Sequence, residues 1–75
     1  IINDDYTPME FVVYILTRFF NKTTDEADTL TIEIHKNGKG IAGIYPLEIA
    51  ETKLRQAMKL ARKEEHPLSI KLESE

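Results

Sequence analysis

Residues 3–12 read Asn-Asp-Asp-Tyr-Thr-Pro-Met-Glu-Phe-Val, and they combine an acidic turn, a helix start and an apolar helical face. Thr7 and Glu10 have the spacing of a capping box, in which each side chain bonds a free backbone N–H at a helix start. Pro8 then falls at the first helical position, where a missing N–H costs nothing. Such a corner can hold a ligand with a cationic head and an apolar side chain, and an N-terminal amino acid has both. A plain turn is the alternative, because Asn and Asp often bond their own backbone.

Three helices are predicted from apolar residues that recur three and four positions apart. The first runs over about 9–20. The second begins after a cap at residue 23 and stops at residues 37–38. The third runs from residue 46 to about 65. On the third helix, the pair Glu51 and Arg55 has the supportive i, i+4 spacing.

Within the second helix, β-strand propensity favours a strand instead, because residues 29–34 alternate like a strand and are rich in β-branched side chains. A strand here would make Asn37-Gly38 a two-residue hairpin turn. Helix is favoured because Thr23 and Glu26 form a second capping box at one end. At the other end Gly38 tolerates the left-handed conformation that stops helices.

The remaining segments are predicted to be strands: a stub at Ile1-Ile2, then residues 40–45, and a half-buried strand at 68–72. The order β-α-α-β-α-β predicts an α/β (α+β) fold, with a three-stranded antiparallel sheet and three helices packed on one side. At 75 residues the chain is expected to be a single domain over 1–75.

Composition argues against several classes of function. The formal net charge is −3 with a pI near 5.4, which disfavours nucleic-acid binding. The chain has no cysteine and no apolar run of about 20 residues, so neither thiol chemistry nor a membrane span is expected. A metal site made by Asp4, His35 and His66 would need three distant segments to converge without a supporting motif. We expect no metal, no cofactor and no enzymatic activity.

Four ordered blocks of the chain resemble the ClpS family, the N-end-rule adaptors of the ClpAP protease. The blocks are residues 3–12, residues 25–27 with His35-x-x-Gly38, residues 48–53, and residues 65–68. The resemblance implies an adaptor that recognises substrate proteins by a first residue of Leu, Phe, Tyr or Trp. It would deliver them to the N-terminal domain of the AAA+ unfoldase ClpA for degradation by ClpP. A monomer in the bacterial cytoplasm is implied, and a plastid location remains open.

The resemblance also assigns roles to individual positions. The substrate's α-amino group would be held by Asn3, Asp4 and His35. The side-chain pocket would be lined by Thr7, Met9, Val12, Thr31, Ile34 and Leu68, with Met9 as the gate against β-branched first residues. Glu48 and Lys53 would face the unfoldase. Read without the resemblance, His35 is a helix C-terminal histidine, and the apolar pocket residues are ordinary core positions.

Two departures from the family pattern lead to expectations. Thr31 stands where the family usually has Met, which implies a roomier pocket with weaker discrimination among large first residues. The flexible N-terminal extension of the family is absent from these 75 residues, so we expect binding with poor delivery. His35 must be neutral to accept a hydrogen bond from an ammonium group, so binding should weaken as the pH falls through about 6.5, the reference pKa of histidine.

Two rival interpretations stay open at this stage. One is a ClpS-like recognition domain of an N-end-rule ubiquitin ligase, which would continue into a much larger protein. The other is an interaction domain resembling the C-terminal domain of a ribosomal stalk protein, which would bind no amino-terminal residue.

Overall fold

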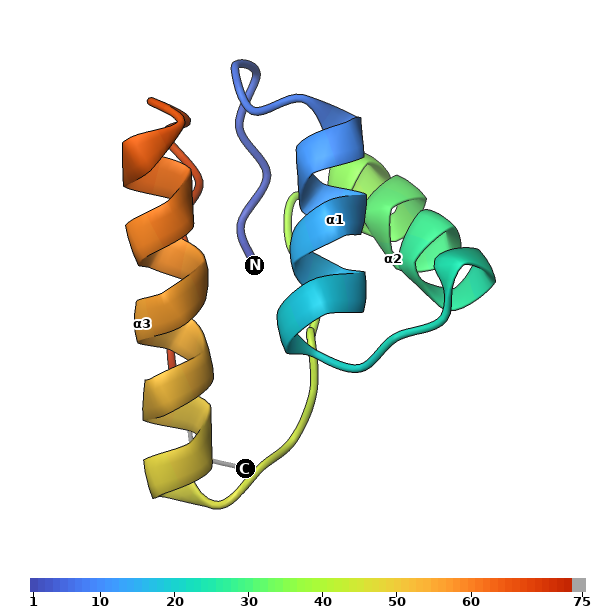
Figure 1. The fold of residues 1–75 in the computed structure, drawn as a ribbon. Coiled ribbons are helices and arrows are strands. Elements are labelled where there is room, and N and C mark those ends of the chain that lie inside the picture. Colours follow the sequence, from blue (N-terminus) through green and yellow to red (C-terminus); the bar gives the residue numbers. More distant parts are fainter. Residues whose placement is uncertain (74–75) are drawn as a thin grey trace.

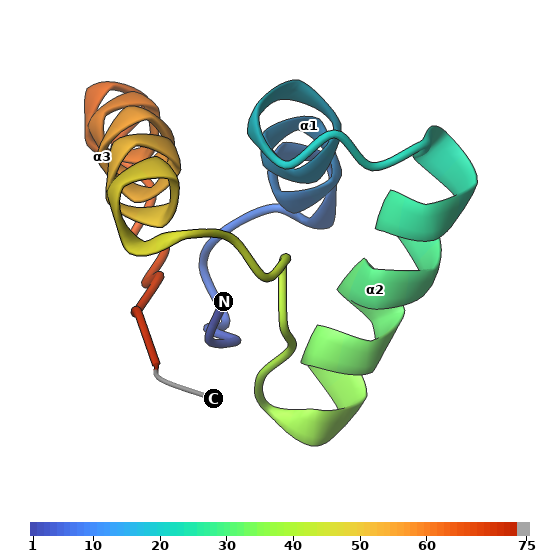
Figure 2. The same ribbon diagram turned by 90° about the horizontal axis from the view of Figure 1, so that it is seen from below.

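The computed structural model describes residues 1–73 and contains three helices. They are α1 (Met9–Phe19), α2 (Thr24–Asn37) and α3 (Leu47–Lys63). Helix α1 lies between the other two and packs against both (Figures 1 and 2). The part of the chain described has no helix with the length and hydropathy needed to cross a membrane.

The three-stranded antiparallel sheet predicted from the sequence is wrong. Ile2 forms isolated antiparallel bridges with Lys39 on one side and Ser69 on the other, and residues 1–73 contain no strand beyond these bridges. The Ile2 N–H donates to the Ser69 carbonyl at 3.0 Å, and the Gly40 N–H donates to the Ile1 carbonyl at 2.9 Å. The three segments thus meet around Ile2 through antiparallel bridges, but their pairing is too short to make a sheet.

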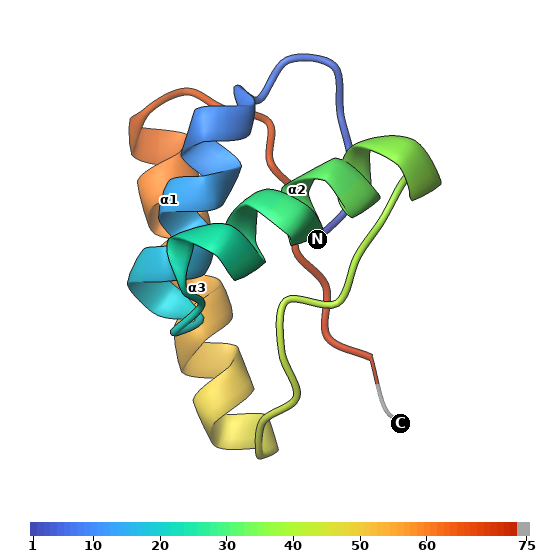
Figure 3. The ribbon, with the colours of Figure 1, turned by 90° about the vertical axis from the view of Figure 1, so that its right-hand side faces the viewer.

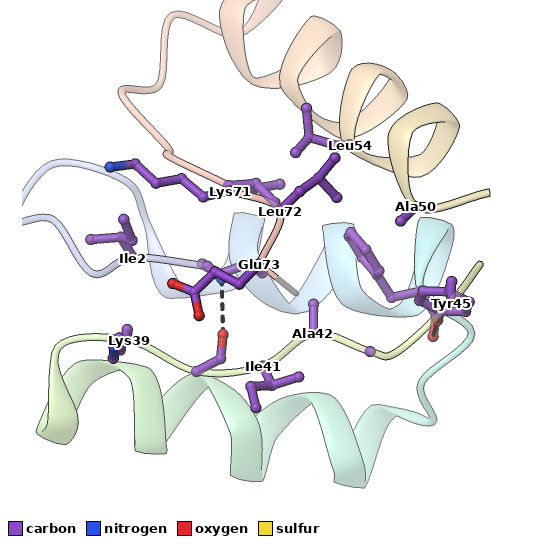
Figure 4. A pocket seen from close by; sticks show the side chains of 15 residues that line it. Ile2, Lys39, Ile41, Ala42, Tyr45, Ala50, Leu54, Lys71, Leu72 and Glu73 are labelled. Carbon is purple, nitrogen blue, oxygen red and sulfur yellow. Dashed lines mark hydrogen bonds between the residues drawn. The ribbon is translucent and has the colours of Figure 1, made fainter. Parts of the chain in front are cut away.

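The pairing is confined to the bridges that Ile2 makes with Lys39 and Ser69, and the two outer segments continue on opposite sides of a hollow. Figure 4 shows Ile41 and Ala42 on one wall of a hollow of about 250 Å³, with Leu72 and Glu73 on the other. No backbone hydrogen bond within the described residues joins 41–45 to 70–73. An alternating pattern predicts which side chains are buried, whereas a sheet also needs a continuous row of backbone partners.

The ends of α2 confirm the helical interpretation of residues 29–34. The Thr23 hydroxyl accepts from the Glu26 N–H at 3.2 Å, and the Glu26 carboxylate accepts from the Thr23 N–H at 3.0 Å, which is the predicted capping box. Gly38 has φ of 85° and ends the helix in the left-handed conformation. Capping at both ends therefore outweighs the β-branched composition of the helix interior.

The capping box predicted for α1 is absent, because its threonine has a different partner. Pro8 is the N-cap of α1, with no side-chain hydrogen bond to the cap, and Thr7 Oγ1 donates to Asp4 Oδ2 at 2.8 Å. Helix α3 ends at Lys63, before the predicted Glu65, which has a left-handed φ of 59°. The predicted pair between Glu51 and Arg55 is confirmed at 3.6 Å.

The core lies where α1 meets the other segments. Ile15 and Leu16 of α1 are fully buried, and Ala57 and Ala61 are the buried positions of α3. Small residues on α3 let the two helix axes approach closely. Leu47, the first residue of α3, is 65% exposed.

Candidate functional site

A cavity of about 180 Å³ opens between the N-terminal turn, the start of α1 and the C-terminal half of α2. Figure 3 shows the N-terminal segment arching from α1 towards the C-terminal end of α2, where the Asn3 N–H donates to the Gly38 carbonyl at 2.8 Å. The structure brings to this cavity all nine residues that the resemblance assigned to ligand binding: Asn3, Asp4, Thr7, Met9, Val12, Thr31, Ile34, His35 and Leu68. An apolar cavity of roughly 150 Å³ holds benzene. The space therefore suits one side chain of the size of Leu or Phe.

The acidic turn is organised around the carboxylate of Asp4. Its Oδ1 accepts from the Tyr6 N–H at 2.8 Å and from the Thr7 N–H at 2.6 Å. Its Oδ2 accepts from the Thr7 hydroxyl at 2.8 Å. A carboxylate has about four acceptor positions, so one position on Oδ2 is left for a further donor.

The surroundings of Asp4 favour its charged form. Partial burial acts to raise the pKa of Asp4, but the hydrogen bonds from Thr7 and Tyr6 and the positive charge of His66 outweigh it and hold that pKa below its ordinary value. His66 lies next to this turn with its ring tilted against Phe11, at 4.5 Å between ring centroids. The turn thus presents a carboxylate that is ionised at neutral pH.

The inner wall of the cavity is aliphatic. Val12, Ile34 and Leu68 are buried, and Thr31, at 4% exposed, is the buried polar residue among them. The Thr31 hydroxyl donates to the Ala27 carbonyl at 2.7 Å, so the helix backbone satisfies it. Thr31 therefore adds no free donor to the pocket.

The position of Ile34 is fixed from behind by the chain that leaves α2. A Cβ atom added at Gly40 would lie 2.6 Å from Ile34 Cγ1, a distance that real contacts do not reach. Close approach of the backbone at Gly40 thus holds the Ile34 side chain in the cavity wall.

Two of the residues that line the cavity are exposed at the surface. Met9 is 47% exposed, and its unbranched thioether side chain is flexible. His35 is exposed in the last turn of α2 and also lines the cavity.

Sequence reasoning missed Asp5, which lines the cavity beside Asp4, and the flanking residues Ile1 and Ile2. Asp5 could have been included from its place in the acidic turn. The two isoleucines could not, because their contribution depends on the pairing of Ile2 with Lys39 and Ser69.

The residues expected to face an unfoldase lie on α3, away from this cavity. Glu48 is exposed in the first turn of α3. The Lys53 ammonium donates to the Phe19 carbonyl at 2.6 Å and lies 5.0 Å from the centre of the Tyr45 ring. Lys53 therefore caps the C-terminal end of α1, a role that the sequence did not predict.

The geometry of the cavity suits a ligand with two features. The Asp4 carboxylate has one free acceptor position, and it lines the same cavity as the aliphatic wall. A primary ammonium group can bond the carboxylate, and an apolar side chain attached to it can fill the cavity. No group of three metal-ligating side chains is close enough to hold an ion in the described part of the chain.

Comparisons with known proteins agree with this geometry. The family model described as ATP-dependent Clp protease adaptor protein ClpS matches residues 1–71. Proteins named ATP-dependent Clp protease adapter protein ClpS are similar over the whole chain: one from Caulobacter vibrioides (strain NA1000 / CB15N) is 51% identical, and one from Parvibaculum lavamentivorans is 52% identical. The chain spans 69% and 68% of the lengths of those two proteins, and 64% of a Hyphomonas neptunium relative that is 51% identical.

A solved structure is also similar to the fold. Agrobacterium tumefaciens ClpS2 bound to L-phenylalaninamide superposes with a TM-score of 0.85 at 34% sequence identity. The match covers 89% of this chain and 81% of that one.

Proposed function

The chain belongs to the ClpS family of ATP-dependent Clp protease adaptor proteins, and on this premise we propose that it binds the N-terminal residue of substrate proteins in the 180 Å³ cavity. The preferred first residues are Leu, Phe, Tyr and Trp. The observation that carries the proposal is the single cavity that contains both the ionised Asp4 and the aliphatic wall. The similar ClpS2 structure supports it, because L-phenylalaninamide has a free α-amino group and an apolar side chain.

Recognition has two energetic parts in this proposal. An α-amino group has a pKa of about 7.7–8.0 and is largely cationic at neutral pH, so it donates charge-assisted hydrogen bonds to Asp4, with Asn3 and His35 as further partners. Burial of a Leu or Phe side chain against Val12 and Ile34 adds roughly 1.5–3 kcal/mol. The ammonium identifies a chain terminus, and the pocket selects the residue.

The proposed role is that of an adaptor without catalysis of its own. The bound substrate would be handed to a ClpA-type AAA+ unfoldase, with the adaptor acting as a monomer in the bacterial cytoplasm. Glu48 supports this docking role, because it is exposed on α3 and away from the ligand cavity. The Lys53 ammonium is half-buried between Phe19 and Tyr45, and it has two N–H groups beyond the one bonded to Phe19.

The direct test is a fluorescence-anisotropy titration with one peptide in four forms: Leu-start, Leu-start with an acetylated N-terminus, Met-start and Ile-start. Because hydrogen bonds to charged groups contribute about 1.5–3 kcal/mol, acetylation is expected to weaken binding by roughly 10- to 100-fold. Equal binding of the acetylated peptide would overturn the roles of Asn3, Asp4 and His35 and leave only an apolar groove.

A further inference from the structure

A second hollow lies between α1 and α2, directly beside the cavity. It is lined by Met9, Glu10, Val13, Asp28, Thr31 and Ile32. Two of these residues, Met9 and Thr31, also line the cavity. The two hollows are therefore adjacent.

The second hollow combines an apolar floor with an acidic rim. Met9 and Ile32 are each 47% exposed, although both are large apolar side chains. Glu10 comes from α1 and Asp28 from α2, and both are exposed. Across residues 1–73 neither carboxylate is in an ion pair, since the salt bridge found there joins Glu51 and Arg55. The hollow thus suits a side chain with an aliphatic stem and a cationic head, which describes Lys and Arg.

The geometry points to this hollow as a subsite for the third residue of the bound substrate, with a preference for Lys or Arg there. This inference rests on the proposed function. Side chains of an extended peptide alternate between two faces, so the first and third share a face and the second points away. The first and third side chains are about 6.6 Å apart along the chain, since each residue of an extended strand rises about 3.3 Å. The two hollows share Met9 and Thr31 as lining residues, so they are adjacent, as two sites for side chains on one face of a peptide must be.

The test uses peptides that begin Leu-Ala-Lys, Leu-Ala-Ala, Leu-Ala-Glu, Leu-Lys-Ala and Leu-Glu-Ala, otherwise identical and labelled at the C-terminal end. We expect the third-position Lys peptide to bind about three- to fivefold more tightly than the third-position Glu peptide at low salt, as for an exposed ion pair. The difference should shrink in high salt, where exposed charges are screened. A difference that is larger at the second position than at the third would overturn the inference.

Two double variants identify the residues responsible. Glu10→Gln with Asp28→Asn removes the acidic rim and should bring the affinity ratio of the Lys and Glu peptides close to one, with unchanged affinity for Leu-Ala-Ala. Asp25→Asn with Glu33→Gln makes the same change of net charge beside a different hollow of α2, and it should leave most of the ratio in place. An equal loss in both variants would mean that net charge alone sets the preference, and the subsite would be wrong.

Failure of the inference can be told apart from failure of the proposed function. If Leu-Ala-Ala binds and its acetylated form does not, the proposed function stands. In that case equal affinities for Lys and Glu at the third position overturn the subsite alone. If instead free and acetylated Leu-Ala-Ala bind equally, the proposed function fails and the subsite fails with it. An effect of Ile32→Ser on the ranking of first residues, without an effect at the third position, would assign the hollow to the first side chain and also overturn the inference.

Discussion

Asp4 links the local structure of the N-terminal turn to the proposed recognition of an amine. Asn at this position keeps an oxygen that can accept from the Tyr6 and Thr7 N–H groups, so Asp4→Asn should preserve the turn. It removes the charge that pairs with an ammonium group, and we expect affinity for a Leu-start peptide to fall on the order of tenfold. Anisotropy titration measures the loss, and thermal unfolding checks that the fold is retained. Asp25→Asn, an exposed change in the first turn of α2, is the matched control and should leave binding unchanged.

The pH dependence of stability provides an independent test of the same carboxylate. The pKa of Asp4 is below its ordinary value in the folded protein, so the folded state binds this proton less readily than the unfolded chain. The stability that this difference supplies is fully present above about pH 4 and is lost as the pH falls through the lowered pKa. Urea unfolding of the wild type and of Asp4→Asn should therefore give free energies of unfolding that converge in acid. Curves that stay parallel from about pH 6 to about pH 2.5 would contradict the assignment.

Thr31 is the pocket position at which the resemblance to the family leads us to expect methionine. It is buried in the cavity wall, and its hydroxyl is already bonded to the Ala27 carbonyl. Thr31→Met would add apolar volume to a cavity of about 180 Å³. We expect sharper discrimination among Leu-, Phe-, Trp- and Ile-start peptides, with the largest loss for Trp. Identical rankings for the two proteins would show that position 31 does not set the size of the pocket.

At the residue scale the resemblance identified a set of side chains that the structure gathers in one place. Their positions in the sequence, from Asn3 to Leu68, could not show this by themselves, because convergence depends on how α1 packs against α2. The role of Thr7 as a donor to Asp4 was missed, since the spacing of Thr7 and Glu10 fits a capping box equally well.

The elements themselves depend on their terminal residues. Gly38 ends α2 with φ of 85°, and a Cβ atom there would meet nothing within 4 Å. Gly38→Ala should therefore destabilise the protein by about 1 kcal/mol through backbone conformation alone, and Gly38→Asn should cost less, because Asn tolerates the left-handed region. Chemical denaturation of both variants tests this, and equal losses would contradict the role assigned to the left-handed conformation of Gly38.

Helices were predictable from this sequence because their signals are local. The capping box at Thr23, the stop at Gly38 and the periodicity of α1 each involve neighbours within a few positions. The sheet was not predictable in the same way. Residues 40–45 were predicted to form a strand, yet Ile41 and Ile44 are 73% and 69% exposed, and no backbone hydrogen bond within the described residues joins 41–45 to another segment.

Across the whole molecule, α1 and α3 are joined by a contact that depends on one lysine. The Lys53 ammonium bonds the Phe19 carbonyl at the end of α1 and lies over the Tyr45 ring. Lys53→Met keeps the aliphatic stem and removes the charge, so we expect a loss of about 1–2 kcal/mol in the free energy of unfolding. Lys59→Met, an exposed change on the same helix, should have little effect. If both variants unfold alike, the cap contributes nothing measurable.

This contact matters for experiments on delivery to an unfoldase. A variant at Lys53 that delivers substrate poorly has lost both a proposed docking charge and a contact between helices. Within residues 1–73 the Glu48 side chain makes no hydrogen bond or salt bridge, and the Thr52 hydroxyl donates to its backbone carbonyl. A change of Glu48→Gln therefore separates docking from stability better than any change at Lys53.

The aliphatic lining of the cavity has a spectroscopic consequence. The chain contains three tyrosines and no tryptophan, so a bound Trp-start peptide would supply the complex with its sole indole. Transfer of that indole from water to a wall made by Val12, Ile34 and Leu68 shifts its emission to shorter wavelengths. Excitation at the red edge of the absorption band, where tyrosine contributes little, would then report occupancy of the pocket with no attached dye, and on the timescale of mixing.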